Sequence, residues 1–354
     1  MKPTLGWWHD KKVLVTGHTG FKGAWLTMWL HRLGAIVHGV SLRPTDTNNL
    51  FFAANVSTMC KSTYSDINDI SQLNQIIGSF DPDVCFHLAA QPLVRESYVR
   101  PFETFSTNVM GTVSLLESFR SASNPCSIVI ITTDKVYKNN DRGSPFREVD
   151  PLGSADPYSS SKAAAELVVD SYRTSFFDSV PDIQISSARA GNVIGGGDWS
   201  ADRLIPDCFR AVVDQVPVIV RNPSFTRPWQ HVLDPLMGYM KLAELQTKKV
   251  DIQGAYNFGP SDDVGRSVDA VLKLIGEEEP SLMLDYDNLV GETYKEASTL
   301  ALDTLRAQTT LGFQPVWRFE DAVLRSARWY KSFIAGANAE DLCLQDIADY
   351  EMSL

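Results

Sequence analysis

The sequence predicts an α/β protein built on a doubly wound parallel sheet, and three observations support this. Short apolar stretches, such as 12–16 and 36–42, alternate with longer helical stretches, such as 24–33, along the first half of the chain. The stretch 128–133 is rich in β-branched residues, as are strands that are buried on both faces of a parallel sheet. A glycine-rich turn joins the first apolar stretch to its helix. Strands and helices that alternate in this way form one parallel sheet with helices on both faces.

The composition is that of an ordinary globular chain of 354 residues, with 44% hydrophobic and 21% charged residues. The 32 basic and 43 acidic residues give a net charge of −11, and no basic cluster indicates binding to nucleic acid or a membrane surface. The five cysteines are scattered, so we expect reduced thiols in a cytoplasmic protein, and no metal site. We also expect no signal peptide and no membrane span.

The turn after the first strand reads Thr-Gly-His-Thr-Gly-Phe-Lys-Gly over residues 16–23. Its glycines allow a tight turn and a close approach of the backbone to a ligand, and the following helix offers free N–H groups and a favourable dipole. A Rossmann-type sheet binds the pyrophosphate of a dinucleotide at such a place. The predicted cofactor-binding residues here are Gly17, His18, Thr19, Gly20, Phe21 and Gly23.

The second strand, 36–42, ends at Ser41-Leu42-Arg43, where an acidic residue normally binds the adenosine ribose hydroxyls. Ser41 can still bond a hydroxyl. Arg43 can accommodate a 2′-phosphate, or it can be a solvated loop cation. We expect NAD as the cofactor, and the sequence leaves NADP open.

Chemistry is expected directly after the stretch 128–133, because ligands bind beyond the carboxyl ends of parallel strands. Asp134 and Lys135 lie at this point. Tyr158 and Lys162 are four residues apart at the start of an Ala-rich helical stretch, so they share one helix face. A lysine beside a phenol favours the phenolate, which makes the tyrosine a usable base near neutral pH.

Together these motifs resemble the extended short-chain dehydrogenase/reductases, over nearly the whole chain. The spacing of Gly17, Gly20 and Gly23 is theirs, and so is the set Thr133, Tyr158 and Lys162. Asn108, before a helix expected at 109–120, resembles an asparagine that steadies the active-site backbone, although it could be only a helix cap. The further cofactor-binding residues that the resemblance implies are Asp66, Ile67, Leu88, Ala89, Ala90, Gln91, Asn108, Tyr158 and Lys162.

Longer motifs narrow the resemblance to the nucleotide-sugar 4,6-dehydratases. In the members that act on dTDP-glucose the fifth strand ends in Thr-Asp-Glu, whereas here it ends in Thr133-Asp134-Lys135. This lysine and the stretches 17–26 and 195–207 resemble the branch that acts on CDP-glucose. The implied reaction gives CDP-4-keto-6-deoxyglucose and water, an early step to deoxysugars of surface polysaccharide. Two alternatives stay open: a related dehydratase or epimerase, and a non-catalytic NAD(P)-sensing protein on the same scaffold.

The resemblance also implies roles for the catalytic residues. Tyr158, helped by Lys162 and Thr133, removes the proton of the glucose 4-hydroxyl. Asp134 protonates the departing 6-hydroxyl and Lys135 removes the C5 proton. This assignment needs a neutral carboxylic acid beside a neutral amine, so the swapped assignment stays open. The structural alternative is a surface ion pair at the end of a strand.

The second half resembles the substrate-binding part of the family, which implies a smaller, interleaved C-terminal α/β domain. The expected dinucleotide-binding domain is 1–190 with returning segments near 230–260, and the remaining segments of 191–354 form the sugar-nucleotide domain. A helix is expected to start at 202–206, and a strand at 256–259 is expected to return to the first domain. Arginine suits a diphosphate because its planar fork gives directional, charge-assisted hydrogen bonds. The predicted substrate-binding residues are Asn192, Arg203, Leu204, Arg221, Arg227, His231 and Glu296.

The helices near 108–120 and 158–176 match those through which relatives pair, so a homodimer or homotetramer is expected. The last helix is expected at 319–334. The tail from residue 335 onward is acidic and indicates no element.

Overall fold

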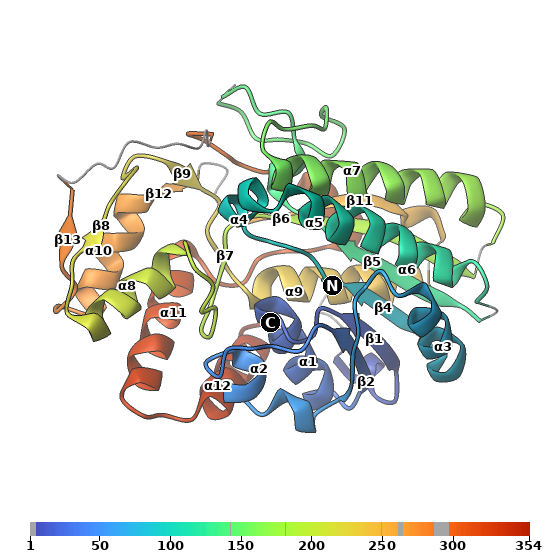
Figure 1. The fold of residues 1–354 in the computed structure, drawn as a ribbon, viewed down its shortest axis with the longest axis horizontal. Coiled ribbons are helices and arrows are strands. Elements are labelled where there is room, and N and C mark those ends of the chain that lie inside the picture. The colour runs from blue at the N-terminus through green and yellow to red at the C-terminus, as the bar shows by residue number, and fades with distance from the viewer. Residues whose placement is uncertain are drawn as a thin grey trace.

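The computed structural model describes residues 5–122, 124–141, 143–180, 182–248, 250–260, 265–286 and 297–354. Its centre is a seven-stranded parallel sheet with the strand order β11-β6-β5-β4-β1-β2-β3 (Figure 1). The order runs outward in both directions from the neighbours β1 and β4, which confirms the doubly wound class. The strands are β1 (Lys12–Thr16), β2 (Ile36–Ser41), β3 (Lys61–Tyr64), β4 (Val84–His87), β5 (Cys126–Ile131), β6 (Ile183–Ala190) and β11 (Gly254–Phe258).

The β-branched sequence of β5 explains why this strand lies in the middle of the protein. Ile128 and Ile130 pack on one face of the sheet, and Val129 and Ile131 pack on the other. Side chains alternate between faces along a strand, so a strand with helices on both sides needs apolar residues at every position. All six residues of β5 are buried.

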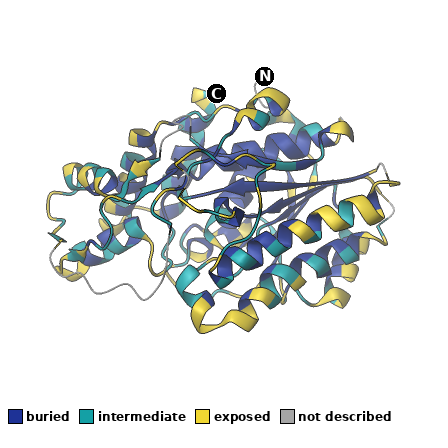
Figure 2. Ribbon diagram, turned by 90° about the horizontal axis from the view of Figure 1, so that it is seen from above, coloured by how far each residue is buried: buried dark blue, intermediate teal, exposed yellow. Residues whose placement is uncertain are grey.

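Two layers of helices cover the sheet. The helices α3 (Ile70–Phe80), α6 (Gly111–Phe119) and α7 (Pro157–Tyr172) contribute to the apolar cluster on one face, and α1 (Phe21–Arg32), α9 (Leu233–Gln246) and α12 (Ala339–Ser353) to the cluster on the other. Figure 2 shows that the sheet between them is buried and that exposed residues lie on the outer faces of the helices. No helix in the described ranges is long and apolar enough to cross a bilayer.

A smaller group of elements lies beside the sheet, on the left in Figure 1. It contains the helices α8 (Leu204–Asp214), α10 (Val268–Glu278) and α11 (Phe319–Ile334). Three two-stranded pairs belong to the same half of the chain: β7 (Val193–Ile194) with β10 (Gln230–His231), β9 (Thr226–Arg227) with β12 (Arg266–Ser267), and β8 (Val218–Ile219) with β13 (Leu284–Asp285). After β10 and before β12 the chain returns to the main sheet, where it forms α9 and then β11, which pairs with β6. The predicted returning strand is therefore confirmed.

The expected helix start at residue 109 is wrong. Helix α5 (Pro101–Phe105), a π-helical turn (Ser106–Met110) and α6 follow one another without a break. Asn108 therefore lies inside a helical run and is buried, which rules out a helix cap. Two short helices precede this region in the chain, α2 (Leu50–Ala53) and α4 (Val94–Val99), and α4 contacts α5 and α7.

Helix α12 occupies most of the tail after residue 335, for which we made no prediction. Cys343, Ile347 and Tyr350 follow one another at the spacing of one helix face and are fully buried. The Tyr350 ring lies 5.5 Å from the Trp29 ring of α1, and Glu351 accepts a hydrogen bond from Trp29 Nε1 at 3.0 Å. The acidic residues of the tail obscured this apolar stripe.

Candidate active site

A cavity of about 970 Å³ lies at the carboxyl ends of the central parallel strands. Its wall includes the turn after β1, the residues after β4, β5 and β6, and the start of α7 and α8. An open parallel sheet binds its ligands at this edge, where the strand order reverses. The five predicted catalytic residues, Thr133, Asp134, Lys135, Tyr158 and Lys162, all line this one cavity.

The glycine-rich turn is shaped by close backbone contacts. Gly17 has a φ of +76°, and a Cβ atom there would lie 2.6 Å from the backbone nitrogen of Ala89. A Cβ atom on Gly23 would overlap the carbonyl oxygen of Gly17. Only glycine fits both positions, and the turn leaves room for a pyrophosphate against the backbone. The predicted cofactor residues that line the cavity are Gly17, Thr19, Gly20, Phe21, Gly23, Ser41, Arg43, Asp66, Ile67, Leu88, Ala89, Ala90, Tyr158 and Lys162.

The segment after β2 forms the adenosine end of this wall. Thr19 Oγ1 lies 2.7 Å from Ser41 Oγ and donates to the carbonyl oxygen of Leu42 at 3.1 Å. The Arg43 guanidinium stands over the Tyr64 ring, with its carbon 5.5 Å from the ring centroid. Asp46 also lines the cavity, so a carboxylate is available here a few residues beyond the position where the sequence lacks one. These residues fit a dinucleotide.

The side chains of two predicted ligand-binding histidines, His18 and His231, are buried in the core and do not line the cavity. The imidazole of His18 is buried, with Nε2 3.0 Å from Ser62 Oγ, and burial lowers its pKa to about 4. The His231 ring lies between Trp25 and Trp317, at centroid distances of 5.8 and 4.6 Å, and burial lowers its pKa to about 3. Both histidines are core residues.

Gln91 and Asn108 lie behind the cavity wall instead of on it. Asn108 Oδ1 accepts from the backbone N–H of Gln91 at 2.8 Å, and its Nδ2 donates to the Gln91 carbonyl at 3.1 Å and to Ser161 Oγ at 2.8 Å. The Gln91 side chain bonds the backbone of Leu93. Asn108 thus ties the turn after β4 to helix α7, in keeping with a steadying role.

Asp134 is held in a buried turn immediately after β5. Thr133 Oγ1 donates to Asp134 Oδ1 at 3.0 Å and accepts from the backbone N–H of Lys135 at 3.3 Å. Asp134 is 1% exposed, and its Oδ2 has no hydrogen-bond partner among the described residues. Burial raises the pKa of Asp134, against the opposing charges of Lys135 and Arg227. A surface ion pair is therefore excluded.

Helix α7 places Tyr158 and Lys162 on the cavity wall. Asp156 caps the helix by accepting from the backbone N–H of Ser159 at 2.8 Å. Burial raises the pKa of the Tyr158 phenol. A hydrogen bond with Thr133 and the positive charge of Arg203 lower this pKa and so partly offset the effect of burial. Burial lowers the pKa of Lys162 to about 8. The Lys162 ammonium donates to the carbonyl oxygen of Ile131 at 3.1 Å. Because burial raises the pKa of Tyr158, it disfavours the phenolate that the sequence predicts.

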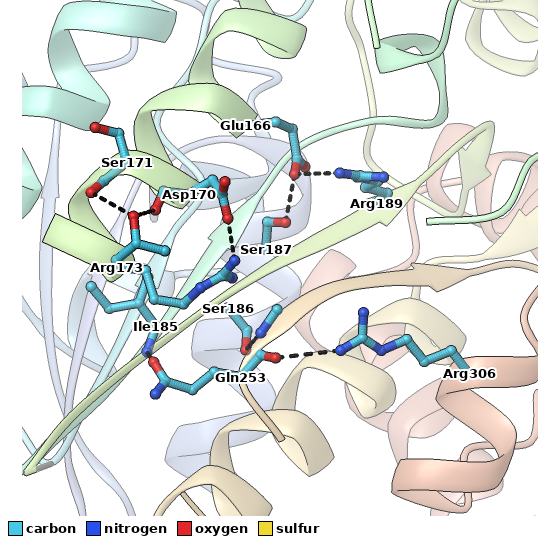
Figure 3. Close-up of polar contacts among 12 residues, drawn as sticks. Glu166, Asp170, Ser171, Arg173, Ile185, Ser186, Ser187, Arg189, Gln253 and Arg306 are labelled. Carbon is cyan, nitrogen blue, oxygen red and sulfur yellow. Dashed lines mark hydrogen bonds and ion pairs between the residues drawn. The ribbon is translucent and has the colours of Figure 1, made fainter. Parts of the chain in front are cut away.

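A buried ion pair fixes α7 against the sheet one turn beyond Lys162 (Figure 3). Glu166 accepts hydrogen bonds from Ser187 Oγ and from Arg189, each at 2.7 Å, and also from Thr132 Oγ1. Ser187 and Arg189 belong to β6, and Thr132 directly follows β5. Glu166 is not among the site residues predicted from the sequence, although its place four residues after Lys162 on the same helix face was an available signal.

The substrate side of the cavity carries several cations. Arg227 is 5% exposed, and Arg221 Nη2 lies 3.6 Å from Asp202 Oδ1. Arg203 precedes α8, which begins at Leu204 as predicted. The predicted substrate residues that line the cavity are Asn192, Arg203, Leu204, Arg221 and Arg227. The prediction for Glu296 lies outside the described residues. Three cavity residues that the sequence analysis left unassigned are Lys22, Gly191 and Asp198.

Comparison with known proteins places this geometry among sugar-nucleotide enzymes. The family model described as GDP-mannose 4,6 dehydratase matches residues 14–325. A CDP-glucose 4,6-dehydratase of Salmonella typhimurium is 43% identical over 353 residues, which cover 97% of each chain. A dTDP-glucose 4,6-dehydratase of Neisseria meningitidis is 26% identical and covers 90% of this chain and 93% of its own.

Solved structures of related folds superpose on most of the chain. The UDP-glucose 4-epimerase of Thermus thermophilus, in complex with NAD, has a TM-score of 0.77 at 22% identity and covers 90% of this chain and 99% of its own. The UDP-glucose 4-epimerase of Thermotoga maritima, with UDP-glucose, has a TM-score of 0.78 at 20% identity and covers 91% and 99%. At these identities the superposition establishes the common fold.

Proposed function

The chain belongs to the GDP-mannose 4,6 dehydratase family of nucleotide-sugar 4,6-dehydratases, and from this premise we propose that it converts CDP-D-glucose to CDP-4-keto-6-deoxy-D-glucose and water, with NAD as its cofactor. The relative at 43% identity supports CDP-glucose as the substrate. The single observation that carries the proposal is the set of residues on the cavity wall. It combines a tyrosine and a lysine for oxidation with an acid and a base for elimination.

The cofactor would lie along the glycine-rich turn, with its adenosine toward Ser41 and its nicotinamide toward Tyr158. When bound, NAD would supply the hydride acceptor for C4 of the sugar and the hydride donor for C6. Tyr158 Oη takes the proton of the 4-hydroxyl, and Thr133 and Lys162 orient this step. The group that accepts this proton is the phenolate of Tyr158, and because burial raises the pKa of the phenol, the phenolate fraction increases as the pH rises.

The elimination falls to Asp134 and Lys135. A 4-ketone acidifies the C5 proton, which Lys135 Nζ accepts, and Asp134 gives a proton to the departing 6-hydroxyl. Burial raises the pKa of Asp134, and this supports its role as the proton donor. The swapped assignment has the opposite charge requirement, because it needs an ionised Asp134 in a buried site.

The diphosphate of the substrate would bind to the arginines on the substrate side of the cavity, Arg203, Arg221 and Arg227. These arginines line the same cavity as the catalytic residues. Planar, charge-assisted hydrogen bonds suit phosphate oxygens. We place the product in the supply of deoxysugars for surface polysaccharide, as the sequence resemblance implies, and the cytoplasmic location stays a prediction.

Self-association is also part of the proposal. Apolar side chains are exposed on the two helical segments through which pairing was predicted, and Phe102, just before them, is 81% exposed. Met110 belongs to the first segment, and Leu167 and Phe176 belong to the second. A homodimer formed through these helices would bury this surface, and a tetramer would need a second contact.

A nucleotide-sugar epimerase is the second candidate, favoured by the structural neighbours. It would use Tyr158 and Lys162 but has no need of an elimination acid and base. Asp134 and Lys135 therefore favour the dehydratase.

The test is a product assay on the purified chain. The protein is incubated separately with CDP-glucose, dTDP-glucose and GDP-mannose, each without added cofactor, with NAD and with NADP, and the alkaline absorbance of a 4-keto-6-deoxy sugar is followed. Product from CDP-glucose, raised by NAD, is the expected result. A protein that binds NAD but forms no such product from any of the three sugars would overturn the dehydratase proposal, and tyrosine-dependent epimerisation would then be sought by chromatography.

A further inference from the structure

Lys22 places a third lysine in the catalytic cavity. It occupies the second position of α1, between Phe21 and Gly23 of the glycine-rich turn, and it lines the cavity. The mechanism above gives it no role. Its position is notable because the glycines around it, Gly17 and Gly23, let the backbone approach a ligand closely.

The surroundings of Lys22 contain more cationic than anionic groups. It interacts electrostatically with Arg203, Asp134 and Asp198, and it also lowers the pKa of Lys162. Both carboxylates have other contacts: Asp134 Oδ1 accepts from Thr133, and Asp198 Oδ1 accepts from the backbone of Ser200 at 3.2 Å. Lys22, Lys162 and Arg203 are thus three cations beside two carboxylates, each of which has one oxygen in a hydrogen bond.

The Lys22 ammonium makes no hydrogen bond or ion pair with any residue that the structure describes. An ammonium group has three donors, and holding it partly away from water without a partner is unfavourable. Burial accordingly lowers the pKa of Lys22 to about 8, and the charge of Arg203 adds to this effect. An anion that bound between Lys22, Lys162 and Arg203 would satisfy the donors and relieve the repulsion between the cations.

We propose that Lys22 binds a phosphate oxygen of one of the two nucleotides that meet in this cavity, the dinucleotide cofactor or the nucleotide sugar. This inference rests on the proposed function for the identity of the two nucleotides. The shared chemistry is a diphosphate, for which a flexible, compact cation is a suitable ligand. Lys22 therefore joins the binding residues, at the glycine-rich turn and apart in the chain from the arginines Arg221 and Arg227.

The test measures binding and not turnover. Dissociation constants of the full-length wild type, Lys22→Met and Lys22→Arg are determined by calorimetry for NAD, and for CDP in the presence of NAD. Adenosine and cytidine serve as the matched probes without phosphate. We expect Lys22→Met to weaken the binding of either NAD or CDP by about tenfold or more, and Lys22→Arg to retain most of the wild-type affinity. The affected ligand identifies the source of the phosphate.

Adenosine and cytidine should bind both variants within about twofold of the wild type, because neither probe carries a phosphate. The proposal is rejected if the variants bind NAD and CDP with wild-type affinity. It is also rejected if Lys22→Met weakens the binding of adenosine or cytidine as much as the binding of NAD or CDP, because that result would indicate a packing effect. Lys22→Gln provides a second neutral variant, and failure of both to fold would make Lys22 a structural residue. Failure of the proposed function is a separate outcome, because it is seen in the wild type as an absence of product.

Discussion

Gly191 lies directly against the carboxylate of Asp134: a Cβ atom at Gly191 would overlap Cγ and Oδ2 of Asp134. The register of the sheet produces this contact. Ile131 of β5 is paired with Ala188 of β6, so the third residue beyond each, Asp134 and Gly191, are neighbours at the carboxyl edge. The buried position of the proposed acid thus depends on a glycine in the adjacent strand connection.

Replacing Gly191 by Ala should displace Asp134 and lower the turnover number by about 10², since misplacement of a reacting group by about 1 Å has an effect of that size. Binding of NAD should be retained. The matched control is Gly259→Ala, after the next strand, β11, where the nearest atom to an added Cβ is Thr304 Cγ2 at 3.4 Å. Steady-state kinetics of both variants checks the prediction, and a Gly191→Ala enzyme with wild-type turnover would contradict it.

Asp134→Asn and Lys135→Met should each reduce turnover by about 10²–10⁴, the usual contribution of a general acid or base. Both variants should still reduce NAD in a single turnover with CDP-glucose, because oxidation at C4 does not require the elimination pair. Stopped-flow absorbance of the reduced nicotinamide separates the two steps. If both variants turn over near the wild-type rate, the elimination roles are wrong.

The same pair predicts a pH dependence. A proton donor with a raised pKa stays protonated to higher pH than an ordinary carboxyl, so turnover limited by elimination should fall as pH rises through the pKa of Asp134. The neutral pair and the ion pair of Asp134 and Lys135 carry the same number of protons, so the falling limb is attributed by substitution. The pH profile of single-turnover elimination is compared for the wild type and Asp134→Asn, and the limb should be absent from the variant; the same limb in both would show that it does not belong to Asp134.

Tyr158→Phe should lower the rates of NAD reduction and of product formation by about 10²–10⁴, while leaving NAD binding unchanged. Phenylalanine keeps the ring packing at this nearly buried site and removes only the proton acceptor. In the wild type, kcat/KM for CDP-glucose should increase with pH, because burial raises the pKa of the phenol. An unchanged single-turnover oxidation in Tyr158→Phe would remove the tyrosine from the mechanism.

Glu166→Gln should lower the free energy of unfolding by about 3–5 kcal/mol, because it leaves the Arg189 guanidinium buried without its counter-ion. The Arg189 interaction holds the pKa of Glu166 below its usual value, against the effect of burial. The stabilisation is therefore present above the unfolded pKa of Glu and is lost as pH falls through the folded pKa. Urea unfolding at neutral and acidic pH measures both effects. The control is Asp170→Asn on the same helix, an exposed pair with Arg173 that should change stability by less than about 1 kcal/mol (Figure 3).

The sequence by itself determined the alternation of strands and helices in the first half of the chain, the glycine-rich turn and the family to which the chain belongs. These features are local, since the apolar stretch of β5, the glycines of the turn and the spacing of Tyr158 and Lys162 each lie within a short segment. The position of the catalytic residues at one edge followed from the rule that ligands bind beyond the carboxyl ends of parallel strands.

Only the tertiary structure decided which polar residues face the cavity and which face the core. His18 and His231 stand beside motif residues but are buried, because Ser62, Trp25 and Trp317 come from distant segments. The environment of Asp134 likewise depends on Gly191, and the anchoring of helix α7 depends on Arg189, residues far along the chain from the groups they contact. Burial and charge are properties of such long-range neighbours, so pKa values and the surroundings of groups such as Lys22 emerge only when the chain is folded.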